Sequence, residues 1–143
     1  LLSGMYGMLR PLDYMQPYRL EMGSKLKVTS KLNNIYKFWD LKITELLNKD
    51  SNGEAIINLA SNEYFKSVKP KSLKSQVITP VFKDFKNGEY KTIMTFVKNA
   101  RGVMARYIID NRLTDPEQIK LFEGNGYSFD VKQSTESSWV FVR

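Results

Sequence analysis

The sequence predicts a mixed α/β (α+β) fold, in which a mixed β-sheet that includes a β-hairpin is covered by α-helices. Two β-rich runs, 77–82 and 90–97, flank the dipeptide Asn87-Gly88, which favours a hairpin turn. Apolar residues recur at helical spacing in 32–47 and again in 98–112. These patterns indicate strands and amphipathic helices that pack around a shared core.

The first third of the chain is predicted to contain a loop and one helix. Residues 10–23 include two prolines and end on a glycine, which predicts an ordered loop. Ser30 is a candidate N-cap for the helix over 32–47. This helix should end near Asn48, before the turn-forming cluster 50–53.

A strand and a short helix are expected next. The short apolar run 55–60 predicts a strand buried on both faces, and Ser61 is a candidate N-cap for a brief helix through Val68. Polar groups at such strand-to-helix junctions commonly face ligands, because the helix N-terminus exposes N–H donors. Asn58 and Glu63 are therefore candidate site residues.

The last third of the chain predicts further regular structure. After the helix over 98–112, Asp115 caps a short helix that two glycines end. The alternating runs 127–131 and 139–142 then predict a terminal hairpin. A length of 143 residues suits a single domain, which we expect over 1–143.

The composition excludes several kinds of site. The chain has no Cys and no His, which rules out disulfides, thiolate nucleophiles and zinc sites built on thiolates. It indicates no cofactor and no metal, and it leaves any catalytic residue unknown. No run approaches the roughly 20 apolar residues that span a bilayer, so we expect a cytoplasmic protein with no membrane partner.

Positive charge is concentrated in the middle of the chain. Twenty-two Lys and Arg against fifteen Asp and Glu give a formal charge of +7, and 66–106 holds ten basic residues against two acidic ones. This excess predicts nucleic acid, contacted through the DNA backbone, as a partner. The alternative is that these lysines only keep a small domain soluble. The predicted phosphate contacts are Lys66, Lys69, Lys71, Lys74, Lys98, Arg101 and Arg106.

A second reading is an enzyme that acts on a small anionic or nucleotide substrate. Two arginines in the loop 10–23 carry the planar fork that binds carboxylate or phosphate. The candidate anion pocket consists of Arg10, Arg19, Glu21, Asn58, Ser61 and Glu63. The alternative is that Arg10 with Asp13, and Arg19 with Glu21, form local ion pairs that hold the loop.

A third pattern is superficially that of a magnesium-dependent nuclease. Asp84, Glu89 and Lys91 match a carboxylate pair plus lysine that can hold a metal and activate water. Charged residues beside a hairpin turn are ordinarily just solvated, which is the alternative.

The first residues, Leu1-Leu2-Ser3-Gly4, are typical of the end of a buried strand. We therefore expect the chain to be a fragment of a longer protein. An unpaired strand edge in such a fragment could be covered by a second copy of the chain, which makes a homo-oligomer possible.

Several ordered blocks resemble the YaaA family of bacterial peroxide-stress proteins. They are spread over essentially the whole chain and are Leu2–Asp13, Gln16–Gly23, Phe38-Trp39, Ile57–Lys66, Pro80–Asp84, Ala100–Arg106 and Val140-Phe141. The resemblance implies the C-terminal portion of a longer, cytosolic protein that helps bacteria survive hydrogen peroxide. It also implies a role in limiting free iron and the DNA damage that iron causes, and it supplies no settled catalytic mechanism.

Overall fold

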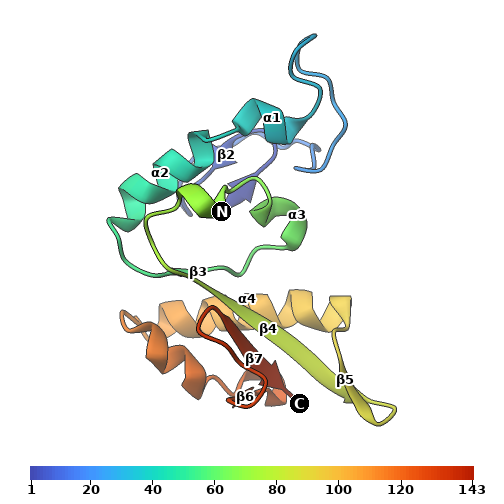
Figure 1. Cartoon of the computed structure of the whole chain (residues 1–143), viewed down its shortest axis with the longest axis vertical. Helices are drawn as coiled ribbons and strands as arrows, with labels where there is room; N and C mark the ends of the chain where they lie inside the picture. Colours follow the sequence, from blue (N-terminus) through green and yellow to red (C-terminus); the bar gives the residue numbers. More distant parts are fainter. The chain divides into compact units, whose positions relative to one another are not determined.

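The computed structural model describes residues 1–143, whose internal contacts gather into two units (Figure 1). Unit 1 comprises Leu1–Glu54 and Ala60–Ser75, and unit 2 comprises Ala55–Leu59 and Gln76–Arg143. Helices occur with a mixed sheet and a small antiparallel sheet, so the predicted mixed α/β class is confirmed. The expectation of a single domain stays a prediction.

Unit 2 is built on a five-stranded mixed sheet. Its strand order is β3 (Ile56–Ile57), β4 (Val77–Lys86), β7 (Ser138–Val142) and β6 (Ser128–Asp130), and β5 (Glu89–Lys91) pairs with β4. The β3–β4 and β4–β7 pairs are parallel, whereas β6–β7 and β4–β5 are antiparallel. The antiparallel β6–β7 pair confirms the predicted terminal hairpin.

The hairpin at Asn87-Gly88 is confirmed, with φ values of 56° and 84° at the two turn positions. The second run was predicted to continue to Val97 and this was wrong, because β5 ends at Lys91 and helix α4 (Met94–Asp110) begins at Met94. Val97 is buried on the same helix face as Ala100 and Met104. The predicted helix over 98–112 is therefore confirmed, with an extra N-terminal turn.

Aromatic side chains fill the core of unit 2. Phe82 on β4 is completely buried, and its ring lies within 6.2 Å of the rings of Phe122, Tyr127 and Phe141. Helix α4 runs along β4 in Figure 1 and contributes its buried face to the same cluster. Every second residue of β4 from Ile78 to Asp84 is buried, and Ile78 and Phe82 belong to this cluster, which joins the helix to the sheet.

The segment after α4 forms two short 3-10 helices, η2 (Pro116–Leu121) and η3 (Gly124–Gly126). The Asp115 cap is confirmed, since its carboxylate accepts from the backbone N–H of Glu117 at 2.9 Å.

Unit 1 begins with a short antiparallel pair, β1 (Leu2–Ser3) and β2 (Gly7–Met8), followed by a long loop. The predicted loop over 10–23 is confirmed, since it contains neither helix nor strand. Gly7 has φ +74°, and a Cβ there would lie 2.7 Å from the ring of Trp39. The indole N–H of Trp39 donates to the carbonyl of Gly4 at 2.8 Å, so this ring fastens the β1–β2 turn to the helices.

The single helix predicted over 32–47 was wrong. The structure has two helices, α1 (Ile35–Trp39) and α2 (Lys42–Ser51), separated at Asp40, whose φ is 42°. The predicted Ser30 cap was also wrong. Asn34 caps α1 instead, because its side chain lies three residues before Lys37 and accepts from that backbone N–H at 2.9 Å.

The predicted Ser61 cap is confirmed, since its hydroxyl accepts from the N–H of Tyr64 at 3.4 Å. The helix it starts, α3 (Asn62–Phe65), ends before the predicted Val68, and η1 (Pro70–Ser72) follows. The strand predicted over 55–60 shortens to β3 and is only half-buried, so burial on both faces was wrong. The short β3 pairs only with β4, at one end of the sheet order, which leaves its side chains partly exposed.

None of the helices is both long enough and apolar enough to span a membrane.

Replacing Phe82 by alanine should lower the free energy of unfolding by about 3–5 kcal/mol, because a fully buried ring leaves a cavity. Urea denaturation followed by circular dichroism measures the change. Leu121→Ala is the control. That side chain is 73% exposed, so its loss should change the free energy of unfolding by less than about 0.5 kcal/mol. Equal losses in the two variants would contradict this account of the core.

Candidate functional site

A basic hollow of about 250 Å³ lies in unit 1 between α1 and the segment that follows α3. It is lined by Asn34, Tyr36, Lys37, Asp40, Lys66 and Lys69. Helix α1 begins after the Asn34 cap and ends before Asp40, and its Lys37 lines the hollow. We call this site the lysine hollow.

Tyr36 connects the two sides of the lysine hollow. Its hydroxyl donates to the carbonyl of Glu63 at 2.9 Å, which ties α1 to α3. Burial, and then the charge of the Glu63 carboxylate, raise the pKa of Tyr36, so the hydroxyl remains a neutral donor at physiological pH. The ammonium group of Lys66 lies 5.4 Å from the centre of the Tyr36 ring, a cation–π distance.

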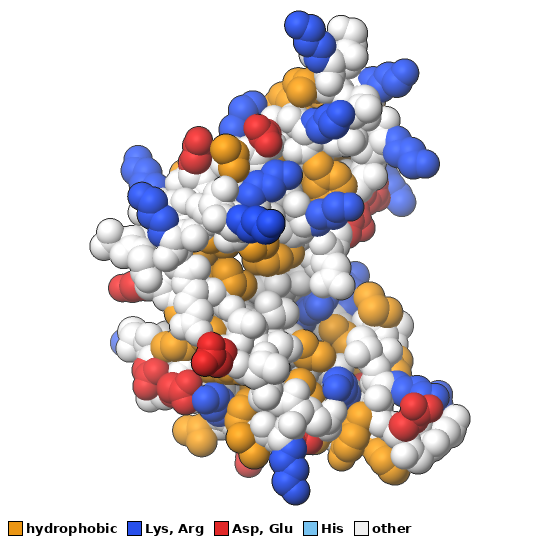
Figure 2. Space-filling view, viewed as in Figure 1, with side chains coloured by type: hydrophobic (Ala, Val, Ile, Leu, Met, Phe, Trp, Pro, Cys, Tyr) orange, Lys and Arg blue, Asp and Glu red, His pale blue; other side chains and the backbone are white.

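The charge at the lysine hollow is strongly positive. Three ammonium groups meet one carboxylate, that of Asp40, and none of the four takes part in an ion pair. Unit 1 as a whole has twelve Lys and Arg against seven Asp and Glu, a net of +5. In Figure 2, blue side chains crowd the part of the view in which Figure 1 draws α1, α2 and α3. This arrangement favours an anionic ligand.

The seven predicted phosphate contacts fall in both units. Lys66 and Lys69 line the lysine hollow, and Lys71 and Lys74 are exposed in the same unit. The other three, Lys98, Arg101 and Arg106, lie on α4 of unit 2.

The three cations of α4 have different surroundings. Lys98 is exposed without an ion pair, whereas Arg106 pairs with Asp110 at 2.8 Å. The Nε of Arg101 is buried and has no hydrogen-bond partner. Burial lowers the pKa of Arg101, although a guanidinium group stays protonated at physiological pH. A buried donor that stays unsatisfied costs about 1–3 kcal/mol.

The six residues of the predicted anion pocket line neither of the two hollows described here. Arg10 pairs with Asp50 at 3.1 Å, and Arg19 with Glu21 at 3.4 Å. Asp13 accepts from the backbone N–H of Arg10, so its predicted ion pair with that side chain is replaced by a backbone contact.

The remaining residues of that set hold the backbone or a neighbouring side chain. The Glu63 carboxylate accepts from the N–H of Gly23 at 2.8 Å, and Ser61 caps α3. Asn58 belongs to unit 2, where its amide donates to Thr79 at 3.3 Å. The enzyme reading stays a prediction, and these contacts give its residues structural roles.

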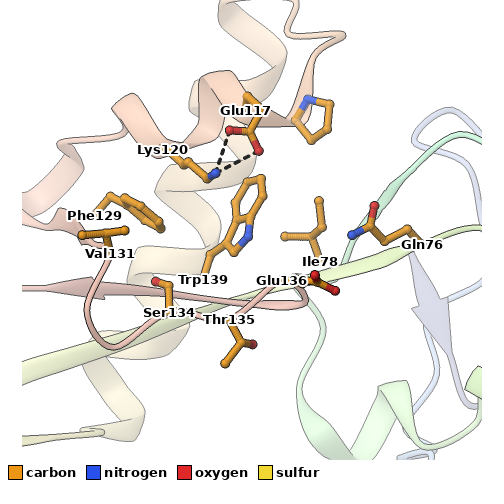
Figure 3. A pocket seen from close by; sticks show the side chains of 11 residues that line it. Gln76, Ile78, Glu117, Lys120, Phe129, Val131, Ser134, Thr135, Glu136 and Trp139 are labelled. Carbon is orange, nitrogen blue, oxygen red and sulfur yellow. Dashed lines mark hydrogen bonds and ion pairs between the residues drawn. The ribbon is translucent and has the colours of Figure 1, made fainter.

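A second hollow, of about 480 Å³, lies in unit 2 (Figure 3). Trp139 and Ile78 form its apolar floor, and the ammonium of Lys120 lies 4.6 Å from the Trp139 ring. Lys120 also pairs with Glu117 at 2.6 Å. With Glu136 as the other charged lining residue, this hollow lacks the excess of positive charge that an anion requires.

Asp84 belongs to a buried network. Its carboxylate accepts from the hydroxyl of Tyr127 at 3.0 Å and from Arg143 Nε at 2.5 Å. The guanidinium of Arg143 also lies 4.6 Å from the Tyr127 ring centre. Glu89 pairs with Lys91 at 2.7 Å, and no group of three or more Asp and Glu is placed to hold a metal.

Residues 1–133 match the family model described as "Peroxide stress protein YaaA". The chain belongs to this family.

Curated relatives agree with that assignment. A UPF0246 protein of Aliivibrio fischeri is 53% identical over 146 aligned residues, which cover all of this chain and 56% of the relative. UPF0246 proteins of Colwellia psychrerythraea and Saccharophagus degradans are 56% and 55% identical, with 56% and 57% of their lengths covered. This YaaA-family chain therefore spans about half the length of the curated relatives it matches.

Sequence reasoning missed four of the six residues that line the lysine hollow in this YaaA-family chain. Lys37 and Tyr36 lie about thirty residues before Lys66 and outside the charge-rich segment, so a count of local charge could not find them. Asn34 offered a usable signal, since Asn is a strong N-cap and Lys37 follows three residues later.

Tyr127→Phe should lower the free energy of unfolding by about 1–3 kcal/mol, because the buried Asp84 carboxylate loses a donor. Burial, and then the hydrogen bond to Asp84, raise the pKa of Tyr127 to about 12. An unfolded tyrosine ionises near pH 10, so this contribution is complete below about pH 10 and is lost as pH rises through about 12.

Urea titrations of both proteins at about pH 8 and about pH 11 measure the difference. The native protein should lose more stability than Tyr127→Phe between the two conditions. Equal losses would contradict the role given to this hydroxyl.

Proposed function

We propose that this YaaA-family chain acts in the peroxide stress response by binding nucleic acid through its phosphates, and thereby limits iron-dependent DNA damage. The observation that supports the proposal is that none of the ten lysines of unit 1 takes part in an ion pair. Three of them line the lysine hollow, where we place the main phosphate contact.

Phosphate suits this surface better than a small carboxylate substrate does. Lysine ammonium groups are flexible point charges that follow a row of phosphates without fixed geometry. The sequence contains no helix-turn-helix, zinc-finger, RNA-recognition or KH motif, so we expect binding that is independent of base sequence. Lys71 and Lys74 extend the contact beyond the lysine hollow within unit 1.

Unit 2 contributes a smaller set of contacts to the proposal. Lys98 is exposed and unpaired, and the buried Nε of Arg101 has no protein partner. Arg106 is the weakest candidate of the predicted set, because Asp110 already neutralises it.

Phosphate binding also offers a route to protection from peroxide. Cations that neutralise DNA phosphates release the counterions condensed there. A ferrous ion displaced in this way no longer reacts with peroxide at the duplex. This mechanism does not require the chain itself to bind iron.

The test is a variant with Lys37, Lys66 and Lys69 all replaced by alanine. Binding to a short DNA duplex is measured by fluorescence anisotropy over a series of salt concentrations. If about four phosphates are contacted, log K should fall against log salt with a slope near −3.6 in the native chain. The variant should bind at least about tenfold more weakly, with a slope shallower by about 2.7.

The matched control replaces Lys25, Lys27 and Lys31, which carry the same total charge and also lack ion pairs. This variant should keep the slope within about one unit of the native value. Equal weakening in the two variants would show a diffuse charge effect, and a flat salt response in the native chain would remove the basis of the proposal.

A further inference from the structure

Strand β5 forms an open edge of the sheet in unit 2. It pairs with β4 alone, and the register places Tyr90 opposite Phe85 and Glu89 opposite Lys86. An edge strand presents N–H and C=O groups that have no partner and can pair with another strand.

The turn determines which backbone groups of β5 face outward. Asn87-Gly88 is a two-residue turn with positive φ at both positions, so Lys86 and Glu89 form the hydrogen-bonded pair that closes it. Hydrogen-bonded and non-hydrogen-bonded pairs alternate along an antiparallel ladder. Phe85 and Tyr90 therefore exchange no backbone hydrogen bonds, and the N–H and C=O of Tyr90 point to the free edge.

The charge order of β5 is complementary to itself. The strand reads Glu89, Tyr90, Lys91. If two copies pair antiparallel about Tyr90, Glu89 lies opposite the partner's Lys91, and Lys91 lies opposite the partner's Glu89. Both are non-hydrogen-bonded positions, where facing side chains approach most closely.

The side chains of the edge are available for such contacts. Glu89 and Lys91 pair only with each other, with 64% and 46% of their side chains exposed. The ring of Tyr90 packs against that of Phe85 at 5.3 Å, and both residues are exposed. Pairing two copies would place two such aromatic pairs side by side on one face of the joined sheets.

We infer that a second copy of this chain binds at the β5 edge, as an antiparallel two-fold dimer. Tyr90 and the partner's Tyr90 exchange two backbone hydrogen bonds, and the two cross-strand Glu–Lys pairs fix the register. The contact is isologous, as a two-fold interface requires. Because the strand is short, the interface is small and the association is weak and concentration-dependent.

The test uses charge exchange across the two-fold axis, in the absence of nucleic acid. Glu89→Lys places lysine opposite lysine in both cross-strand pairs, and Lys91→Glu places glutamate opposite glutamate. Each single variant should raise the dimer dissociation constant by about tenfold or more. The double variant Glu89→Lys with Lys91→Glu should return to the native value within about threefold, because opposite charges face each other again.

The most discriminating experiment mixes the Glu89→Lys and Lys91→Glu variants in equal amounts. Neither should self-associate as the native chain does, yet together they should form a heterodimer with all four cross-strand charges matched. Sedimentation velocity over a concentration series measures each sample, and circular dichroism confirms that each variant is folded.

Glu54→Lys and Lys27→Glu are the matched controls, since they make the same charge changes on exposed residues of unit 1 and should leave association unchanged. The inference is overturned if the native chain stays monomeric at every concentration. It is equally overturned if the single variants associate as the native chain does, or if their mixture forms no heterodimer. None of these outcomes bears on the nucleic-acid proposal, which is measured separately.

Discussion

Unneutralised lysine charge is the constraint on which the account of unit 1 depends. Its two arginines take Asp50 and Glu21 as partners, and all ten lysines are left without an ion pair. Like charges confined to a small surface repel one another, and a bound polyanion relieves that repulsion. At the lysine hollow, Lys37 of α1 meets Lys66 and Lys69 of the segment that follows α3, so three of these charges line one cavity.

Unit 2 neutralises its charge differently. Four of its cations, Lys91, Arg106, Lys120 and Arg143, have carboxylate partners. Of these carboxylates, that of Asp84 is buried and also accepts from the hydroxyl of Tyr127. A buried carboxylate that accepts hydrogen bonds from a hydroxyl and a guanidinium group has its hydrogen-bonding capacity met within the protein. Such a network rigidifies the core and leaves no free group to bind a ligand. The other six cations of unit 2 have no ion pair, and one of them, Arg101, has a buried Nε without a hydrogen-bond partner.

Local chemistry predicted much of the fold. The Asn87-Gly88 hairpin and the caps at Ser61 and Asp115 were right because each depends on residues within a few positions of one another. The break at Asp40 was missed, since no proline or glycine marks it in the sequence. Lys66 and Lys69 were predicted from the local concentration of charge. Lys37 was not, because it lies about thirty residues earlier in the chain and a count of local charge cannot show that the fold places it beside them.

The most direct test of the central claim is a ¹H–¹⁵N correlation spectrum of the chain, titrated with a short DNA duplex at low salt. A chain of 16.6 kDa is well suited to this measurement. We expect the backbone amides around Lys37, Lys66 and Lys69 to shift first and farthest, and added salt to reverse the shifts. Shifts confined to unit 2, or shifts insensitive to salt, would contradict the central claim.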